Sequence, residues 1–186
     1  MFKQATPDGV QVESPDDWLR ECDLWDIERP DIEYRVGFGG RLQSDHAKGW
    51  HWTPAETVRA RAFDFIVPAQ HSRRVSILRQ WQALPEQAVD FQAVVRGDYA
   101  GAARPLWSAD SLNWVLYPDD SHAAGRELRL RQEAFLVSAS LQDLLQRHLA
   151  EFGTLESLGE HNAIHLNDTH PALAPAELMR LLLDEH

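Results

Sequence analysis

Cysteine and long hydrophobic runs are what this sequence most conspicuously lacks. Cys22 is the only cysteine among 186 residues, which excludes an intramolecular disulfide and argues against a secreted, disulfide-stapled domain. No apolar run approaches the length needed to span a bilayer, and the opening residues contain no apolar core of a signal peptide. We therefore expect a cytoplasmic protein.

Positive charge is also in deficit, because 29 acidic residues outweigh 18 basic ones and give a formal net charge of −11. Proteins bind nucleic acid and anionic membranes largely by neutralising phosphates with Lys and Arg, so we expect neither partner. Lys3 and Lys48 are the only lysines. The hydrophobic content of 44% and charged content of 25% are typical of a globular domain with a real core.

Two widespread catalytic motifs are missing, namely the Gly-x-Ser-x-Gly elbow and the Walker phosphate loop. Cys22 has no obvious activating partner, which argues against a thiol nucleophile. His161, His165 and His170 lie close together in the sequence. The first two have the i, i+4 spacing of a helix, but the local pattern indicates a strand, so we expect no metal site.

Residues 1–84 are β-rich. A loose apolar–polar alternation predicts one strand over residues 32–42, ending at a Gly-Gly pair, and another over residues 57–67, ended by Pro68. The second strand changes phase near Phe63, which suggests a bulge or burial on both faces. Residues 73–81 are a further strand candidate. Residues 49–54 read as a turn region, with Trp50 and Trp52 on one face of an extended segment.

Residues 85–186 are mainly helical. Apolar residues recur at steps of three and four from Gly125 to Phe152 and predict an amphipathic helix of about seven turns. Residues 163–166 have the length of a buried strand, and residues 174–184 have a helical pattern. The fold class is therefore mixed α/β, in a single partial domain with one parallel strand at 163–167. Such a strand needs neighbours that the chain does not obviously supply, which suggests a fragment.

Five polar or turn-forming residues follow that strand at once: Asn167, Asp168, Thr169, His170 and Pro171. Ligands bind at the carboxyl ends of strands in open α/β sheets, so this stretch is the best local site candidate. The alternative is an ordinary strand-to-helix turn, with Asp168 or Thr169 as the helix N-cap and Pro171 at its first position. Local chemistry alone favours the alternative.

Asp119 and Asp120 are adjacent carboxylates in a turn spanning residues 117–122. Paired carboxylates can serve as general acid and base. Neighbours on a turn often point apart, however, and Asp after Pro is ordinary turn chemistry. The pattern by itself favours the turn.

Several long motifs resemble the α-glucan phosphorylases, the family of glycogen, starch and maltodextrin phosphorylase. The strongest matches are Val115–Ser121, Gly125–Glu133, Ile164–Ala172 and Glu177–Arg180. Weaker matches, such as Phe38–Arg41 and Leu78–Trp81, extend the similarity over the whole chain in the family's order. The Pro-Asp-Asp-Ser form of the turn is most similar to bacterial glycogen phosphorylases.

The resemblance implies that this chain is part of the N-terminal Rossmann-like domain of a two-domain, GT-B type glycosyltransferase. The full-length enzyme would use inorganic phosphate to release α-glucose 1-phosphate from non-reducing ends of α-1,4-glucan. It would hold pyridoxal 5'-phosphate on a lysine and form a homodimer. Neither Lys3 nor Lys48 has the family's cofactor context, so the chain alone is expected to bind no cofactor and to be inactive.

The resemblance also implies roles for individual residues. Asp119, Asp120 and Ser121 fall in the loop that gates the catalytic cleft, and Asp120 matches the acidic residue that approaches the glucosyl and phosphate sites. Ser121 stands where many members have an asparagine that touches the sugar, and its hydroxyl reaches less far. His170 matches a histidine that lines the same glucosyl pocket, with Asn167 and Asp168 as its supports.

Two other functions stay open at this stage. The chain could be a catalytically inactive, phosphorylase-derived module that at most binds glucan or a partner. A weaker alternative is a hydrolase that uses the Asp119 and Asp120 pair.

Overall fold

The structure is a computed structural model that describes residues 2–5, 9, 12–15, 26–45, 49–69, 71, 73–87, 89–115, 118–167 and 170–184. The chain divides into two compact units. The first comprises Met1–Glu33 and Val58–Gln132, and the second comprises Tyr34–Thr57 and Glu133–His186. Cys22 and Lys48 lie outside the described residues.

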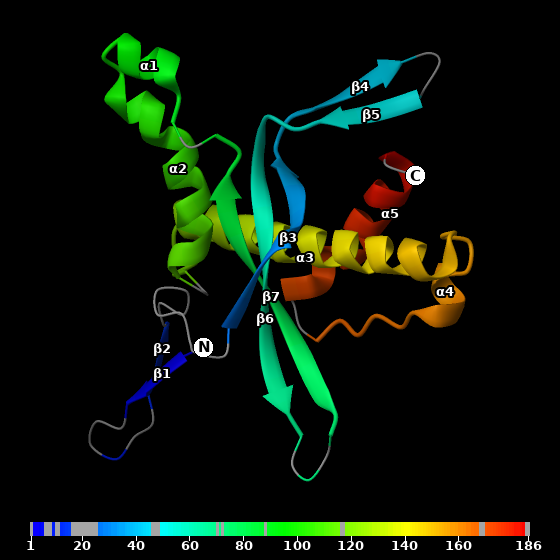
Figure 1. The fold of residues 1–186 in the computed structure, drawn as a ribbon. Coiled ribbons are helices and arrows are strands. Elements are labelled where there is room, and N and C mark those ends of the chain that lie inside the picture. Colours follow the sequence, from blue (N-terminus) through cyan, green and yellow to red (C-terminus); the bar gives the residue numbers. More distant parts are fainter. Residues whose placement is uncertain are drawn as a thin grey trace. The chain divides into compact units, whose positions relative to one another are not determined.

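Antiparallel strands dominate the first half of the chain (Figure 1). Two short strands, β1 (Phe2–Ala5) and β2 (Val12–Pro15), pair with each other. A three-stranded sheet has the order β3 (Asp26–Phe38), β6 (Glu56–Pro68), β7 (Val75–Pro85). These three strands confirm the predicted ones, although β3 begins earlier and β7 runs further than the alternation indicated.

Strand β6 has one buried face from Val58 to Asp64. Val58, Ala60 and Ala62 are buried, and Asp64 continues the same alternation with only 3% of its surface exposed. Its pairing with β7 runs without interruption from Val58 opposite Pro85 to Pro68 opposite Val75, so the suggested bulge is wrong. The apolar–polar alternation changes phase in the sequence because a charged residue, Asp64, occupies a buried position on that face.

Two helices of the first unit follow β7. Helix α1 (Phe91–Val95) and helix α2 (Tyr99–Trp114) begin at Asp90 and Asp98, whose side chains accept hydrogen bonds from the first-turn backbone amides. The side chain of Asn113 fixes α2 to β7, since it both donates to the carbonyl oxygen of Ala83 and accepts from its backbone nitrogen, each at 2.8 Å.

A second hairpin belongs to the other unit. Strands β4 (Arg41–Asp45) and β5 (Gly49–Thr53) are antiparallel. The predicted extended segment with Trp50 and Trp52 on one face is therefore confirmed, whereas the predicted turn is wrong. The hairpin follows a turn at Gly39-Gly40, and a Cβ atom on Gly40 would lie 2.0 Å from the carbonyl oxygen of Thr53. Trp52 donates its indole N–H to the carbonyl oxygen of Gly39 at 2.7 Å, which ties the strand to that turn.

Helix α3 (Ala123–Phe152) confirms the longest predicted element. Its second half packs against helix α5 (Ala174–Asp184), which also matches its prediction. Short helices α4 (Leu158–His161) and η2 (His170–Leu173) lie between them in the chain. One core cluster of this unit consists of Val137, Leu141, Leu145, Ala174 and Leu181. None of the described helices is long and apolar enough to cross a membrane.

The predicted parallel strand at 163–167 is not a strand in the structure. These residues run as an irregular segment, and Ile164 and Leu166 are 44% and 41% exposed. A parallel strand forms only beside hydrogen-bonded neighbours. Among the described strands, none pairs with this segment, so its apolar residues stay at the surface.

Candidate functional site

The turn at residues 118–122 leads directly into α3, within the first unit. Asp119 closes the turn, because its carboxylate accepts hydrogen bonds from the backbone nitrogen of Ser121 at 2.9 Å and from the Ser121 hydroxyl at 3.0 Å. The bond from the Ser121 backbone, followed by the bond from its side chain, lowers the pKa of Asp119. Asp119 therefore has the ordinary structural role that its turn sequence predicted.

Asp120 is held differently. Its carboxylate accepts a hydrogen bond from Arg129 at 2.7 Å, and about half of the side chain, 54%, is exposed. Arg126 donates to the backbone carbonyl oxygens of Asp120 and Ser121 at 3.1 and 3.2 Å. The first turns of α3 thus orient an accessible carboxylate. Asp119 and Asp120 have separate donors, which does not support a proton shared between them.

Gly125 makes this arrangement possible. It is buried, and a Cβ atom built on it would lie 1.6 Å from the carbonyl oxygen of Asp119. The backbone nitrogen of Gly125 donates to Nδ1 of His122 at 2.9 Å, so the imidazole caps the start of the helix. Sequence reasoning did not identify Gly125, His122, Arg126 or Arg129 as supports. The sequence contained one signal for this contact: Gly125 lies in the first turn of a strongly predicted helix, where glycine is unfavourable.

The other predicted residues belong to the second unit. Asn167 is exposed, and the backbone of His170 begins η2. Asp168, Thr169 and the side chain of His170 lie outside the described residues. The structure therefore brings Asp119, Asp120 and Ser121 together in one turn, and the proposed support of His170 by Asn167 and Asp168 stays a prediction.

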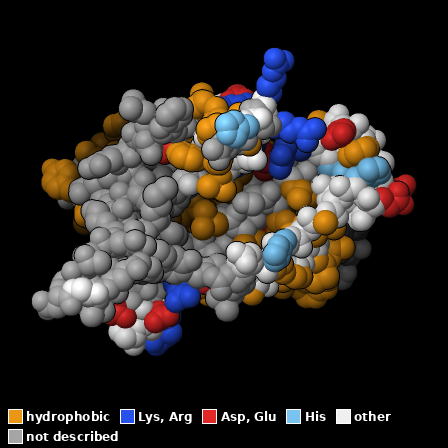
Figure 2. Space-filling view, turned by 90° about the horizontal axis from the view of Figure 1, so that it is seen from below, with side chains coloured by type: hydrophobic (Ala, Val, Ile, Leu, Met, Phe, Trp, Pro, Cys, Tyr) orange, Lys and Arg blue, Asp and Glu red, His pale blue; other side chains and the backbone are white. Residues whose placement is uncertain are grey.

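An apolar groove of about 280 Å³ lies beside the 163–167 segment. Its walls come from α3, including Leu136, Val137 and Leu141, and from Ile164 and Leu166. Figure 2 shows hydrophobic side chains gathered beside histidine side chains on one face of the molecule. His165 is among the residues that line the groove.

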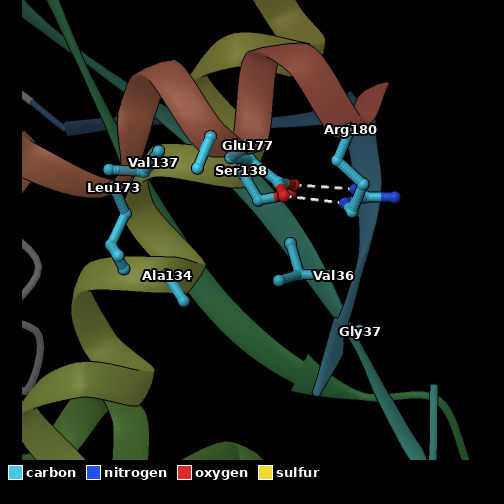
Figure 3. A pocket seen from close by; sticks show the side chains of 9 residues that line it. Val36, Gly37, Ala134, Val137, Ser138, Leu173, Glu177 and Arg180 are labelled. Atoms are coloured by element: carbon cyan, nitrogen blue, oxygen red, sulfur yellow. Dashed lines mark hydrogen bonds and ion pairs between the residues drawn. The ribbon is translucent and has the colours of Figure 1, made fainter. Parts of the chain in front are cut away.

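A second cavity, of about 260 Å³, lies between α3, α5 and β3 in the same unit (Figure 3). Glu177 and Arg180 form a two-pronged ion pair at its wall, with both nitrogen–oxygen distances 2.7 Å. The guanidinium of Arg180 also lies over the ring of Trp52, 4.8 Å from its centroid. The two charges of this wall are thus already matched.

In the described part of the chain, no group of three or more His, Cys, Asp or Glu side chains is arranged to hold a metal ion. His161 instead stacks on Phe152, with ring centroids 4.0 Å apart, and its Nδ1 lies 3.1 Å from the carbonyl oxygen of Ser157.

Comparison with known proteins agrees with these motifs. The model of the family described as carbohydrate phosphorylase matches residues 1–186. The glycogen phosphorylases of Pasteurella multocida and Haemophilus influenzae are each 45% identical over 185 residues. The human liver form is 38% identical over 192 residues. These matches cover 99% or more of this chain but only 22 or 23% of each relative. The chain spans about a fifth of the length of those relatives, and it belongs to the carbohydrate phosphorylase family.

Proposed function

We propose that this chain is part of a glycogen or α-1,4-glucan phosphorylase, which releases α-glucose 1-phosphate from non-reducing ends of the glucan. Both compact units would then belong to the N-terminal Rossmann-like domain of a two-domain, GT-B type enzyme. The observation that carries the proposal is the family match over residues 1–186, together with 45% identity to two glycogen phosphorylases. We place the full-length protein in the cytoplasm, as a homodimer.

Asp120 is the residue we assign most directly to the sugar. Phosphorolysis with retention passes through an oxocarbenium-like centre that carries positive charge. A carboxylate held beside that centre stabilises the charge without reorganising. Asp120 has the needed features, since its side chain is accessible and Arg129 orients it. Asp119 and Ser121 shape the loop around it.

His170 would line the same glucosyl pocket, with Asn167 and Asp168 as supports. An imidazole can hold a sugar hydroxyl by donating or accepting a hydrogen bond. Ile164 and Leu166, which are apolar but exposed beside the groove, support the proposal that other parts of the full-length protein cover this segment. In the full-length protein, strands supplied by other parts of the chain would pair with residues 163–167, and that strand would then present His170 at its carboxyl end.

Pyridoxal phosphate would supply the phosphate group that relays a proton in the complete enzyme. The side chains that the structure describes include no lysine, so they offer no amine to its aldehyde. We place the cofactor lysine in another part of the full-length protein. What this chain contributes is binding and orientation of the sugar.

A chimaera tests the proposed function. Residues 1–186 would replace the matching 22% of the Pasteurella multocida enzyme, a region of 45% identity. We expect the chimaera to release glucose 1-phosphate from glycogen and inorganic phosphate. We expect the isolated chain to release none and to show no absorbance of a cofactor aldimine. A folded, cofactor-loaded chimaera without product, or an active isolated chain, would contradict the proposal.

A binding module without catalysis is the second candidate. It is favoured by the small share of each relative that the chain spans, 22 or 23%. Calorimetric titration of the isolated chain with a linear α-1,4-glucan separates the two. Saturable heat together with an inactive chimaera would support the module instead of the enzyme.

A further inference from the structure

His148 is a buried histidine that none of the preceding roles uses. It lies near the end of α3, and only 3% of its surface is exposed. Both ring nitrogens nevertheless have polar neighbours. Nδ1 lies 2.9 Å from Nδ2 of Asn162, and Nε2 lies 3.3 Å from the hydroxyl of Ser157. Both neighbours come after α3 in the chain, in the connection that leads to residues 163–167.

The amide of Asn162 determines which ring nitrogen carries the proton. An amide nitrogen only donates hydrogen bonds, so Nδ1 of His148 must accept. The same amide nitrogen also donates to the carbonyl oxygen of Leu158 at 3.1 Å. Reversing the amide would set its oxygen against that carbonyl oxygen, and two acceptors would face each other. Nδ1 of His148 is therefore the acceptor, and Nε2 carries the N–H that is directed at Ser157.

The surroundings of His148 fit this assignment of its ring nitrogens. Phe152, also on α3, has its ring centroid 4.6 Å from that of His148. His161 on α4 is the titratable neighbour, with its ring centroid 6.0 Å away. Among the described residues, no carboxylate contacts either nitrogen of His148. A proton on Nδ1 would set one N–H group against another, with no counter-ion beside it.

The position of this contact gives it a consequence for the candidate site. Asn162 is the last residue before the irregular segment, which then runs back along α3 from its C-terminal end towards Glu133 and Leu136 (Figure 1). We propose that His148, with Nδ1 as acceptor and its N–H on Nε2, is a positioning residue. It anchors Asn162 and thereby fixes where the run towards Asn167 and His170 begins. Its effect on sugar binding depends on the proposed function, but its protonation state does not.

Nuclear magnetic resonance of the chain labelled with ¹⁵N-histidine tests the protonation state. We expect His148 to show an N–H on Nε2 and an acceptor Nδ1. Asn162→Asp replaces the donor with an acceptor and should move a proton to Nδ1. Asn167→Asp makes the same change at the other end of the run and should leave the His148 signals as they were. A proton on Nδ1 in the unaltered chain, or no change in Asn162→Asp, would overturn the assignment.

Kinetics of the chimaera test the positioning role. His148→Phe keeps a ring beside Phe152 but accepts no hydrogen bond, and we expect it to raise KM for glucan about tenfold, the effect of one lost polar contact. His148→Gln can still accept from Asn162 and should restore most of the affinity. His161→Phe, which retains the stack on Phe152, is the matched control and should change KM little. An unchanged KM in a folded His148→Phe chimaera would overturn the role, whereas an inactive unaltered chimaera would overturn the proposed function instead.

Discussion

Replacing Asp64 with Ala is expected to lower the free energy of unfolding by about 3 kcal/mol, the lower end of what breaking a buried charge cluster costs. Arg79 binds both carboxylate oxygens, at 2.7 and 2.8 Å, and Arg29 adds a third contact at 3.0 Å. The Asp64 side chain is 5% exposed. The arginines are 19% and 36% exposed, so water can partly compensate them once the carboxylate is gone, which limits the loss.

Urea unfolding of the unaltered chain and Asp64→Ala measures this loss. Asp31→Ala is the matched control, because Asp31 also binds Arg29, at 2.7 Å, but its side chain is 61% exposed. Exposed ion pairs contribute little, so the control should change stability much less. Equal effects of the two substitutions would contradict the buried role of Asp64.

The same cluster predicts a pH dependence. The hydrogen bonds from Arg79, opposed by burial, lower the pKa of Asp64 in the folded chain. A carboxyl group with a depressed folded pKa stabilises the fold at pH values above its unfolded pKa, about 3.9, and loses that contribution as the pH falls through the folded value. The stability difference between the unaltered chain and Asp64→Ala should thus be constant near neutrality and shrink below about pH 4. A difference that grew in acid would show the opposite shift.

Gly125→Ala is the second substitution with a large expected effect. Alanine normally favours a helix over glycine by about 1 kcal/mol. Here the added Cβ atom would lie 1.6 Å from the carbonyl oxygen of Asp119 and 3.0 Å from Cε1 of His122. A backbone oxygen cannot turn aside as a flexible side chain can, so the turn must move. We expect a net loss of about 2 kcal/mol, within the usual range for overpacking.

Gly159→Ala is the control for that loss. Gly159 lies in α4, and a Cβ atom on it would meet nothing within 4 Å. The same substitution should therefore stabilise the chain by about 0.5–1 kcal/mol. Thermal unfolding of both variants gives the comparison, and a shift of the same sign in the two would contradict the packing of Gly125 against the turn.

The elements predicted well are those with a single buried face. The apolar stripes of α3 and α5 and the alternation of β6 reflect packing that each element carries in its own sequence. Strand β5 was not predicted as a strand because the apolar face that it shares with β4 is not buried: Leu42 is 68% exposed and Trp50 is 70% exposed. Residues 163–167 do not form the predicted strand in this structure, because a parallel strand depends on neighbours that a local pattern cannot report.

The candidate site shows the same division. The turn at 118–122 was identifiable from Pro118 and the two adjacent aspartates. What orients Asp120 was not, because Arg129 reaches it from two turns into the helix, and such a contact depends on how the turn folds back. The buried position of Asp64 could not be predicted either, because the arginines that bind it lie 15 and 35 positions away in the sequence.

A double-mutant cycle in the chimaera tests most directly whether Asp120 and His170 act on one sugar. Asp120→Asn, His170→Ala and the double variant would be compared by kcat/KM for phosphorolysis of glycogen. We predict that each single substitution lowers kcat/KM. We also predict that the combined loss departs from additivity by more than about 0.5 kcal/mol, as our proposal that both side chains stabilise the same transition state requires. Losses that add within that margin, or single variants as active as the unaltered chimaera, would contradict it.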